Sequence, residues 1–363
     1  MRVMVCKAVE EYDSRVMPIL SGRRLTQPYP TGVLQMSYEN STRKQSFLSQ
    51  AVRAMKSIKA GTAVLAVLAA CASYPALAQD DGETVIVSTL AGSGKQGFAD
   101  GKGSAARFSY LGGIAVDAEG NLYVTDNSRI RKITPEGEVS TFAGGECCYY
   151  DRGRINPARF TDPIDIAIDA TGNLYVLDQW KPKIRKVTPE GKVSIFVDDG
   201  FNDPNRIAID AEGNLYVSEG GRIRKITPEK KFSTFVSANY GIAAIAIDAA
   251  GNLYVSDYDN HRIRKVTPDG KASTLAGSGK EGFVDGKGSA ARFNYPAGNA
   301  IDAVGNLYVP DNGRIRKITP EGNVTTLAGN VKNHGSIAID AEGNLYVVDT
   351  QNPRIRKIVI QRP

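Results

Sequence analysis

The chain has 363 residues, of which 42% are hydrophobic and 23% are charged, which is ordinary globular usage and excludes a disordered or collagen-like chain. The net charge of +6 comes entirely from residues 1–78, which hold 10 Lys and Arg against 4 Asp and Glu. The rest of the chain holds 35 basic and 35 acidic residues and is electrically neutral. This neutrality argues against a nucleic-acid partner, which needs a net positive surface.

The N-terminal segment resembles a secretory signal from Met55 onwards. Two lysines precede an apolar run over 61–71, and a proline and the triplet Ala-Leu-Ala follow, which predicts cleavage after Ala78. The run is about half the ~20 residues of a spanning helix, so no transmembrane anchor is expected. An alternative is the lipobox-like Leu-Ala-Ala-Cys ending at Cys71, which would make the protein lipid-anchored.

These features divide the chain into three parts. Residues 1–54 are interpreted as an upstream extension outside the mature protein, with a separate regulatory arm as the alternative. Residues 55–78 are interpreted as a signal peptide, and 79–363 as the folded domain. Either processing route exports the protein, so we expect a periplasmic or secreted location, or an anchor through Cys71.

The folded domain contains six copies of one phrase. The first copy, over 113–144, reads GIAVDAEGNLYVTDNSRIRKITPEGEVSTFAG. Intervals of 52, 41, 38, 54 and 38 residues fall in the range of propeller blades. The copies are marked by Asp117, Asp169, Asp210, Asp248, Asp302 and Asp340.

A complete copy predicts four short strands, which in the first copy cover 114–116, 122–124, 130–133 and 139–142. Glycine, proline and Asp or Asn between them are typical of tight turns. An alanine stands two residues before every repeat Asp, as expected for strands crowded around an axis. We therefore predict an all-β, six-bladed β-propeller.

The ring is expected to close through its N-terminal strand. The sixth copy ends after its third strand, at 354–360, whereas residues 85–92 match the fourth-strand phrase at 273–277. The N-terminal strand then completes the last blade and removes exposed strand edges.

The phrase GNLYV-x-D-x-x-x-RIRK-I/V-TP, repeated over residues 84–363, resembles the NHL-repeat family. The glycine-rich linkers at 92–108 and 277–293 are similar to those of bacterial members. The resemblance implies a bacterial exported six-bladed propeller used mainly as a binding platform. Some related propellers are enzymes, so the family does not fix the function.

Two repeated motifs have a structural interpretation. Each basic tetrad, such as 129–132, follows an acidic residue, so we predict structural ion pairs rather than phosphate contacts; the acids are Asp126, Asp178, Glu219, Asp257, Asp311 and Asp349. The linkers formally match a dinucleotide fingerprint, but no βαβ unit accompanies them. Asp100 and Asp285 lack the twelfth-position Glu of an EF-hand loop, so we expect them to cap a short turn rather than bind calcium.

Metal chemistry has few candidates. The folded domain has only two histidines, His261 and His334, too few for the histidine cluster of an NHL-type zinc lyase. A calcium site would use Asp165, Asn205 and Asn299 at the channel mouth near His334, although Arg206 would oppose a cation. We expect no cofactor, with calcium as the alternative.

Cys147 and Cys148 are adjacent in a long loop. An exported location favours oxidation, so three alternatives stay open: a vicinal disulfide, a link to another molecule, or two free thiols.

Three long loops, at 92–112, 143–163 and 276–297, share a face with the loops between second and third strands, and this face is our candidate for binding. The favoured contact residues are Trp180, Tyr258, His261, Tyr149 and Tyr150, whereas Phe108, Phe160 and Phe293 are expected to pack under their own loops. The predicted function is a monomeric, non-enzymatic scaffold of the bacterial cell envelope that binds a protein or small ligand. The alternative is a lactonase- or lyase-like enzyme with a divalent metal in the channel.

Overall fold

The structure is a computed structural model that describes residues 83–145, 159–180, 182–198, 200–237, 241–329, 331 and 335–361. All of them belong to the compact unit Ala78–Pro363. None of the helices in this described part is long and apolar enough to cross a membrane. The predictions for the signal sequence, Cys71 and residues 1–54 lie outside the described residues.

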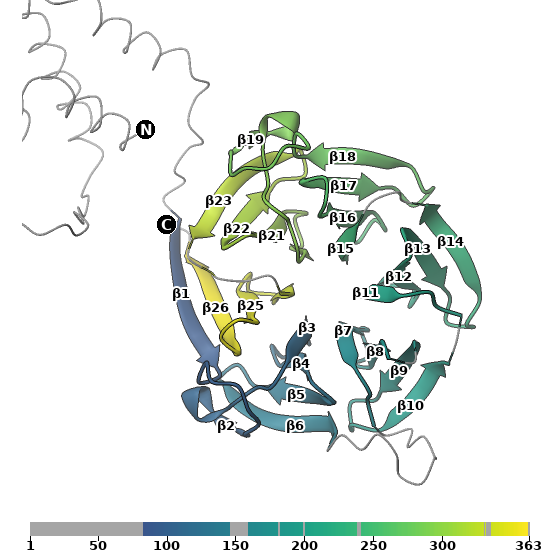
Figure 1. Ribbon diagram of the computed structural model, residues 1–363, viewed down its shortest axis with the longest axis vertical. Helices are drawn as coiled ribbons and strands as arrows, with labels where there is room; N and C mark the ends of the chain where they lie inside the picture. Colours follow the sequence, from purple (N-terminus) through teal and green to yellow (C-terminus); the bar gives the residue numbers. More distant parts are fainter. Residues whose placement is uncertain are drawn as a thin grey trace, which may run out of the picture. The chain divides into compact units, whose positions relative to one another are not determined.

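Six antiparallel sheets are arranged radially around an axis, and each sheet is one blade (Figure 1). Blade 1 contains β3 (Leu111–Val116), β4 (Leu122–Asp126), β5 (Arg129–Ile133), β6 (Glu138–Gly144) and the short β2 (Gly101–Lys102). Blade 2 contains β7 (Pro163–Ile168), β8 (Leu174–Asp178), β9 (Lys183–Val187) and β10 (Val193–Val197). Blade 3 contains β11 (Pro204–Ile209), β12 (Leu215–Glu219), β13 (Arg222–Ile226) and β14 (Phe232–Ser237).

Blade 4 contains β15 (Ile242–Ile247), β16 (Leu253–Asp257), β17 (Arg262–Val266) and β18 (Ala272–Ala276). Blade 5 contains β20 (Ala300–Ile301), β21 (Leu307–Asp311), β22 (Arg314–Ile318), β23 (Asn323–Gly329) and the short β19 (Gly286–Lys287). Blade 6 contains β24 (Ile337–Ile339), β25 (Leu345–Asp349), β26 (Arg354–Gln361) and β1 (Thr84–Ala91). Two short 3₁₀ helices, η1 (Gly103–Ala105) and η2 (Gly288–Ala290), lie in the glycine-rich linkers.

The repeated Leu-Tyr-Val strand explains how neighbouring blades pack. Successive side chains of a strand point to opposite faces of the sheet. Leu174 and Val176 of blade 2 therefore pack against Ala115 and Tyr123 of blade 1 in one hydrophobic cluster. Equivalent clusters join the other blades, so the core of the propeller lies between its sheets rather than inside any one of them.

The repeat Asp organises the turn between the first two strands of a blade. The Asp117 carboxylate accepts the backbone N–H of Asn121 at 2.7 Å, the Asn121 amide at 2.9 Å and the Tyr123 hydroxyl at 3.2 Å. Asn at the end of this turn is fixed twice by the same carboxylate, which is why Asp and Asn repeat together. The turn thus connects each inner strand to the Tyr that packs against the next blade.

The predicted closure is confirmed. Strand β1 pairs antiparallel with β26 from Thr84 opposite Gln361 to Ala91 opposite Ile355. Figure 1 shows β1 on the outer rim beside β26. Val85 and Val87 pack against the cluster between blades 5 and 6, so the N-terminal strand contributes to the core as well as to the hydrogen-bond ladder.

The linker prediction for Asp100 and Asp285 was wrong. Neither 3₁₀ helix has a side-chain cap, and the residue in the N-cap position is a lysine. Asp100 instead contacts Arg131 Nη2 at 2.6 Å, and Asp285 contacts Arg316 Nη2 at 2.7 Å. A carboxylate binds a buried guanidinium more strongly than it binds the N–H groups at the start of a single 3₁₀ turn. Each linker is therefore held to its blade by an ion pair with the buried arginine.

Candidate functional site

The loops expected to share one face do meet. The N–H of Asn127 donates to Tyr110 O at 2.9 Å, and that of Tyr258 donates to Gly241 O at 3.1 Å. In each case a loop between second and third strands bonds the loop that enters an inner strand. We call the surface formed by these two sets of loops the loop face.

The acidic residues before the basic tetrads form the predicted structural ion pairs. Asp126 contacts Arg131 at 2.8 Å, Asp178 contacts Arg185 at 3.0 Å, and Asp257 contacts Arg264 at 2.7 Å. Each pair joins neighbouring parts of one blade. The arginine at the third position of these tetrads is therefore engaged within the fold, which removes it from any surface contact with phosphate.

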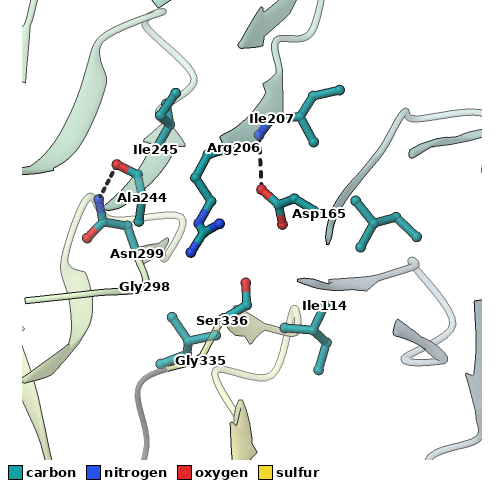
Figure 2. A pocket seen from close by; sticks show the side chains of 12 residues that line it. Ile114, Asp165, Arg206, Ile207, Ala244, Ile245, Gly298, Asn299, Gly335 and Ser336 are labelled. Atoms are coloured by element: carbon teal, nitrogen blue, oxygen red, sulfur yellow. Dashed lines mark hydrogen bonds between the residues drawn. The ribbon is translucent and has the colours of Figure 1, made fainter. Parts of the chain in front are cut away.

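An axial pocket lies where the inner strands begin, at the end nearest the loop face, and has a volume of about 450 Å³ including space open to solvent (Figure 2). Apart from Gly335, its lining residues come from two positions of the repeat, those four and three residues before the repeat Asp, and all of these except Gly113 line it. The first position holds Gly113, Asp165, Arg206, Ala244, Gly298 and Ser336. The second holds Ile114, Ile166, Ile207, Ile245, Asn299 and Ile337. The lining therefore contains one acid and one base, whereas the isoleucines of the second position are buried in the clusters between the blades.

Asp165 is the acid of this lining and is only 6% exposed. Its Oδ2 accepts the backbone N–H of Ile207 at 2.9 Å, and it also accepts that of Ile166. Burial raises the pKa of the Asp165 carboxyl, while the nearby Arg206 charge and these two hydrogen bonds lower it. The net direction is upward because desolvation is the largest effect.

Arg206 is the base of the lining, on the neighbouring strand β11. Its Nη1 donates to Asn205 O at 2.8 Å and to Asn205 Oδ1 at 2.7 Å. The Asn205 amide in turn donates to Ile242 O at 3.2 Å, which anchors the arginine to blade 4. Figure 2 shows the guanidinium turned into the pocket between Asp165, Asn299 and Ser336.

Asn299 replaces the isoleucine that the other five repeats carry at the second position. Its Nδ2 donates to Tyr254 O at 3.0 Å, and its Oδ1 accepts the Ser256 hydroxyl at 2.7 Å. The inner strand of blade 5 is only two residues long, and the Asn299 side chain holds it to blade 4. Its role in the structure is therefore to connect two blades.

These contacts do not fit a divalent cation well. The side-chain oxygens of Asn205 and Asn299 already accept hydrogen bonds, and Figure 2 shows the Arg206 guanidinium between Asn299 and Asp165. Within the described ranges, no group of three His, Cys, Asp or Glu residues is placed to hold a metal ion. A hard cation needs several oxygen ligands, and the pocket offers one carboxylate and one competing positive charge.

An aromatic group lies on the loop face between blades 4 and 5. The ring centroids of Tyr258 and Tyr295 are 4.8 Å apart, and those of His261 and Tyr295 are 4.6 Å apart. The Tyr295 N–H donates to His261 Nδ1 at 3.3 Å. Tyr258 and His261 were favoured contact residues from the sequence. Tyr295 lies in the long loop 276–297 of the same candidate face, and blade packing brings it against them although it is 34 residues from His261.

The remaining residues predicted on these loops differ in their exposure to solvent. Trp180 lies on the loop face and is 61% exposed. Phe108, Phe160 and Phe293 are buried under their loops, as predicted. The candidates Tyr149, Tyr150, Cys147, Cys148 and His334 lie outside the described residues.

Comparison with known proteins identifies the class. A family model described as NHL repeat matches residues 240–266. Comparison with curated protein sequences found no match.

Solved structures resemble the chain along most of its length. A protein of unknown function from Bacteroides thetaiotaomicron is 20% identical with a TM-score of 0.65, covering 77% of this chain and 76% of that one. An auxiliary nutrient binding protein from Bacteroides ovatus is 19% identical with a TM-score of 0.62, covering 77% of each chain. A gluconolactonase from Xanthomonas campestris is 13% identical with a TM-score of 0.55, covering 70% of this chain and 87% of that one.

At these identities the likeness establishes the fold alone. The protein is a six-bladed β-propeller, with a polar pocket on its axis. With the matched repeat in blade 4 and the same phrase in every other blade, it is an NHL-repeat propeller.

Proposed function

We propose that this propeller is a non-enzymatic binding module of a bacterial cell envelope, which takes a small polar ligand in the axial pocket. The observation that carries this proposal is the divergence of the six repeats at the pocket. The repeats keep Asp-Ala-x-Gly-Asn in their turns and Leu-Tyr-Val in their strands, yet the first pocket position holds five residue types in six blades. A position that served only to build the propeller would be expected to hold the same residue type in every blade.

The charges of the pocket support the same conclusion. Burying a charged group costs free energy unless a partner compensates it. Asp165 and Arg206 lie on neighbouring strands, but among the described residues they form no ion pair with each other. They converge on the axis from a rigid scaffold, as the polar groups of ligand pockets do.

The comparisons are consistent with a binding role in an envelope. One similar structure is named as an auxiliary nutrient binding protein. Export of this chain rests on the signal-like sequence over 55–78. The gluconolactonase has the same fold, but a metal-dependent lactonase would need more oxygen ligands than Asp165 supplies, so the binding role is the better supported of the two.

The test is thermal unfolding of the full chain with a panel of small cations, anions, zwitterions and neutral sugars. We expect one class to raise the melting temperature in a concentration-dependent way. Ser336→Trp would fill the pocket and abolish this shift, while Val304→Trp, on an exposed turn, would keep it. A panel without any stabilising class, or a shift that survives in the Ser336→Trp variant, would overturn the proposal.

A further inference from the structure

We propose that the ligand of the axial pocket is a compact carboxylate that also carries a hydrogen-bond donor, with the carboxylate on Arg206 and the donor on Asp165. This inference rests on the proposed function and specifies its ligand class. The donor would be the ammonium group of an amino acid or the hydroxyl group of a hydroxy acid.

The first step is the orientation of Arg206. Two hydrogen bonds from Nη1 to Asn205, at 2.8 and 2.7 Å, fix the plane of the guanidinium. Within the described part of the chain, its Nη2 and Nε atoms have no hydrogen-bond partner, and the group points into the pocket (Figure 2). A guanidinium held in one plane with two free donors matches the two oxygens of a carboxylate.

The second step is the environment of Asp165. Its two hydrogen bonds come from backbone N–H groups of Ile166 and Ile207, which fix the carboxylate but do not neutralise it. Burial has removed most of the water that would solvate its charge. A ligand ammonium or hydroxyl group would supply the donor that water no longer provides, and a bound ammonium would also compensate the charge.

The third step is the pairing of these two groups in one ring. Gly113, Ala244, Gly298 and Ser336 hold the same repeat position in the other four blades and carry no charge, and the last three line the pocket. The ring therefore presents one positive and one negative group, and its net charge is zero. A ligand with a carboxylate and a donor matches both groups, whereas a simple anion leaves Asp165 without a partner.

The size of the ligand is limited by the second ring of pocket residues. Five isoleucines and Asn299 surround the axis next to the charged ring. The volume of about 450 Å³ includes space open to solvent, so it suits a ligand of few atoms. The isoleucine side chains pack between the blades, so the pocket offers a ligand little apolar surface.

The experiment is isothermal titration calorimetry of the full chain with three matched probes, L-alanine, L-lactate and propionate. They share the three-carbon carboxylate and differ in the group on the second carbon, which is an ammonium, a hydroxyl or neither. We expect alanine or lactate to bind at least tenfold more tightly than propionate. The tighter of the two identifies the donor.

Two variants test the assigned roles. Arg206→Gln should weaken binding of all three probes about tenfold or more, because it removes the charged fork. Asp165→Asn should reduce the preference over propionate while propionate binding itself changes little. Arg222→Gln, in the same blade but paired with Glu219 outside the pocket, is the control and should bind like the parent. Circular dichroism of each variant separates loss of binding from loss of fold.

The outcomes separate this inference from the proposed function. Equal binding of propionate, alanine and lactate would overturn the role of Asp165 and with it the inference. Stabilisation by a neutral sugar that is lost in Ser336→Trp, without binding of any carboxylate, would overturn the inference and leave the proposed function standing. Absence of every ligand class would overturn both.

Discussion

Arg131 and Asp126 face each other inside blade 1, with Arg131 Nη1 2.8 Å from Asp126 Oδ2 and both side chains almost inaccessible to solvent. The other terminal nitrogen of Arg131 contacts Asp100 of the linker at 2.6 Å. Blade 5 repeats the arrangement with Arg316 between Asp311 and Asp285. One buried arginine therefore holds both its own strands and the linker that crosses them.

Replacing Arg131 by Met should destabilise the propeller substantially. The change leaves Asp126 buried without its partner, and breaking a buried pair on one side typically costs about 3–5 kcal/mol. Urea unfolding would measure the loss. The control is Lys271→Met, because Lys271 and Asp269 form a solvent-exposed pair whose removal should not move the midpoint. An unchanged midpoint for Arg131→Met would contradict this account.

Strand β1 should be required for the stability of the whole ring. Val87 packs into the cluster between blades 5 and 6, whereas its neighbour Ile86 is 45% exposed. Val87→Asp should lower the melting temperature strongly, and Ile86→Asp should change it little. Deletion of residues 84–92 should have the largest effect, because blade 6 loses its outer strand. A deletion variant that melts like the parent would show that the ring does not depend on this closure.

The fold was largely predictable because its determinants are local and repeated. Asp117 and Asn121 encode a turn, and Leu122, Tyr123 and Val124 encode a strand that packs on both faces. The extra strands β2 and β19 were not predicted. Each has two residues, too short for any periodicity, and forms only because the linker returns along the outer strand of its blade.

Alkaline pH should weaken the propeller through its buried tyrosines. Burial and the repeat Asp raise the pKa of Tyr123, Tyr175 and Tyr254 to about 12. A raised folded-state pKa means that the stabilisation is fully present below the unfolded value of 10.0 and is lost as the pH rises to about 12. The free energy of unfolding should therefore fall across this window, while ultraviolet absorbance reports the ionisation. Stability that stays constant from pH 9 to pH 12 would contradict the expectation, and Tyr123→Phe should make the decline less steep.

Removal of divalent metal should leave the protein unaffected. The asparagine oxygens near Asp165 are already hydrogen-bonded, and Arg206 repels a cation at the same position. We expect the same melting temperature with calcium and with EDTA, and no stoichiometric metal in elemental analysis of the purified full chain. A calcium-dependent rise in melting temperature that Asp165→Asn abolishes would favour the enzymatic alternative instead.

The site was predicted less completely than the fold. Asp165, Asn205 and Asn299 were recognisable as non-repeating polar residues at the start of the inner strands, but their sequence positions do not show which hydrogen bonds they make. Asn299 was expected beside an open channel, and it is held by Tyr254 and Ser256 of the preceding blade. Such contacts join residues more than 40 positions apart, so they depend on how the blades are stacked.

The closure of blade 6 has a mechanical consequence. Thr84, at the start of β1, lies opposite Gln361, at the end of β26. The first and last strands of the propeller therefore enter and leave blade 6 side by side. A force that pulls these two residues apart acts on one backbone pair at a time. Tension on the two ends of the propeller would therefore separate β1 from β26 sequentially, starting at Thr84 and Gln361, which requires little force.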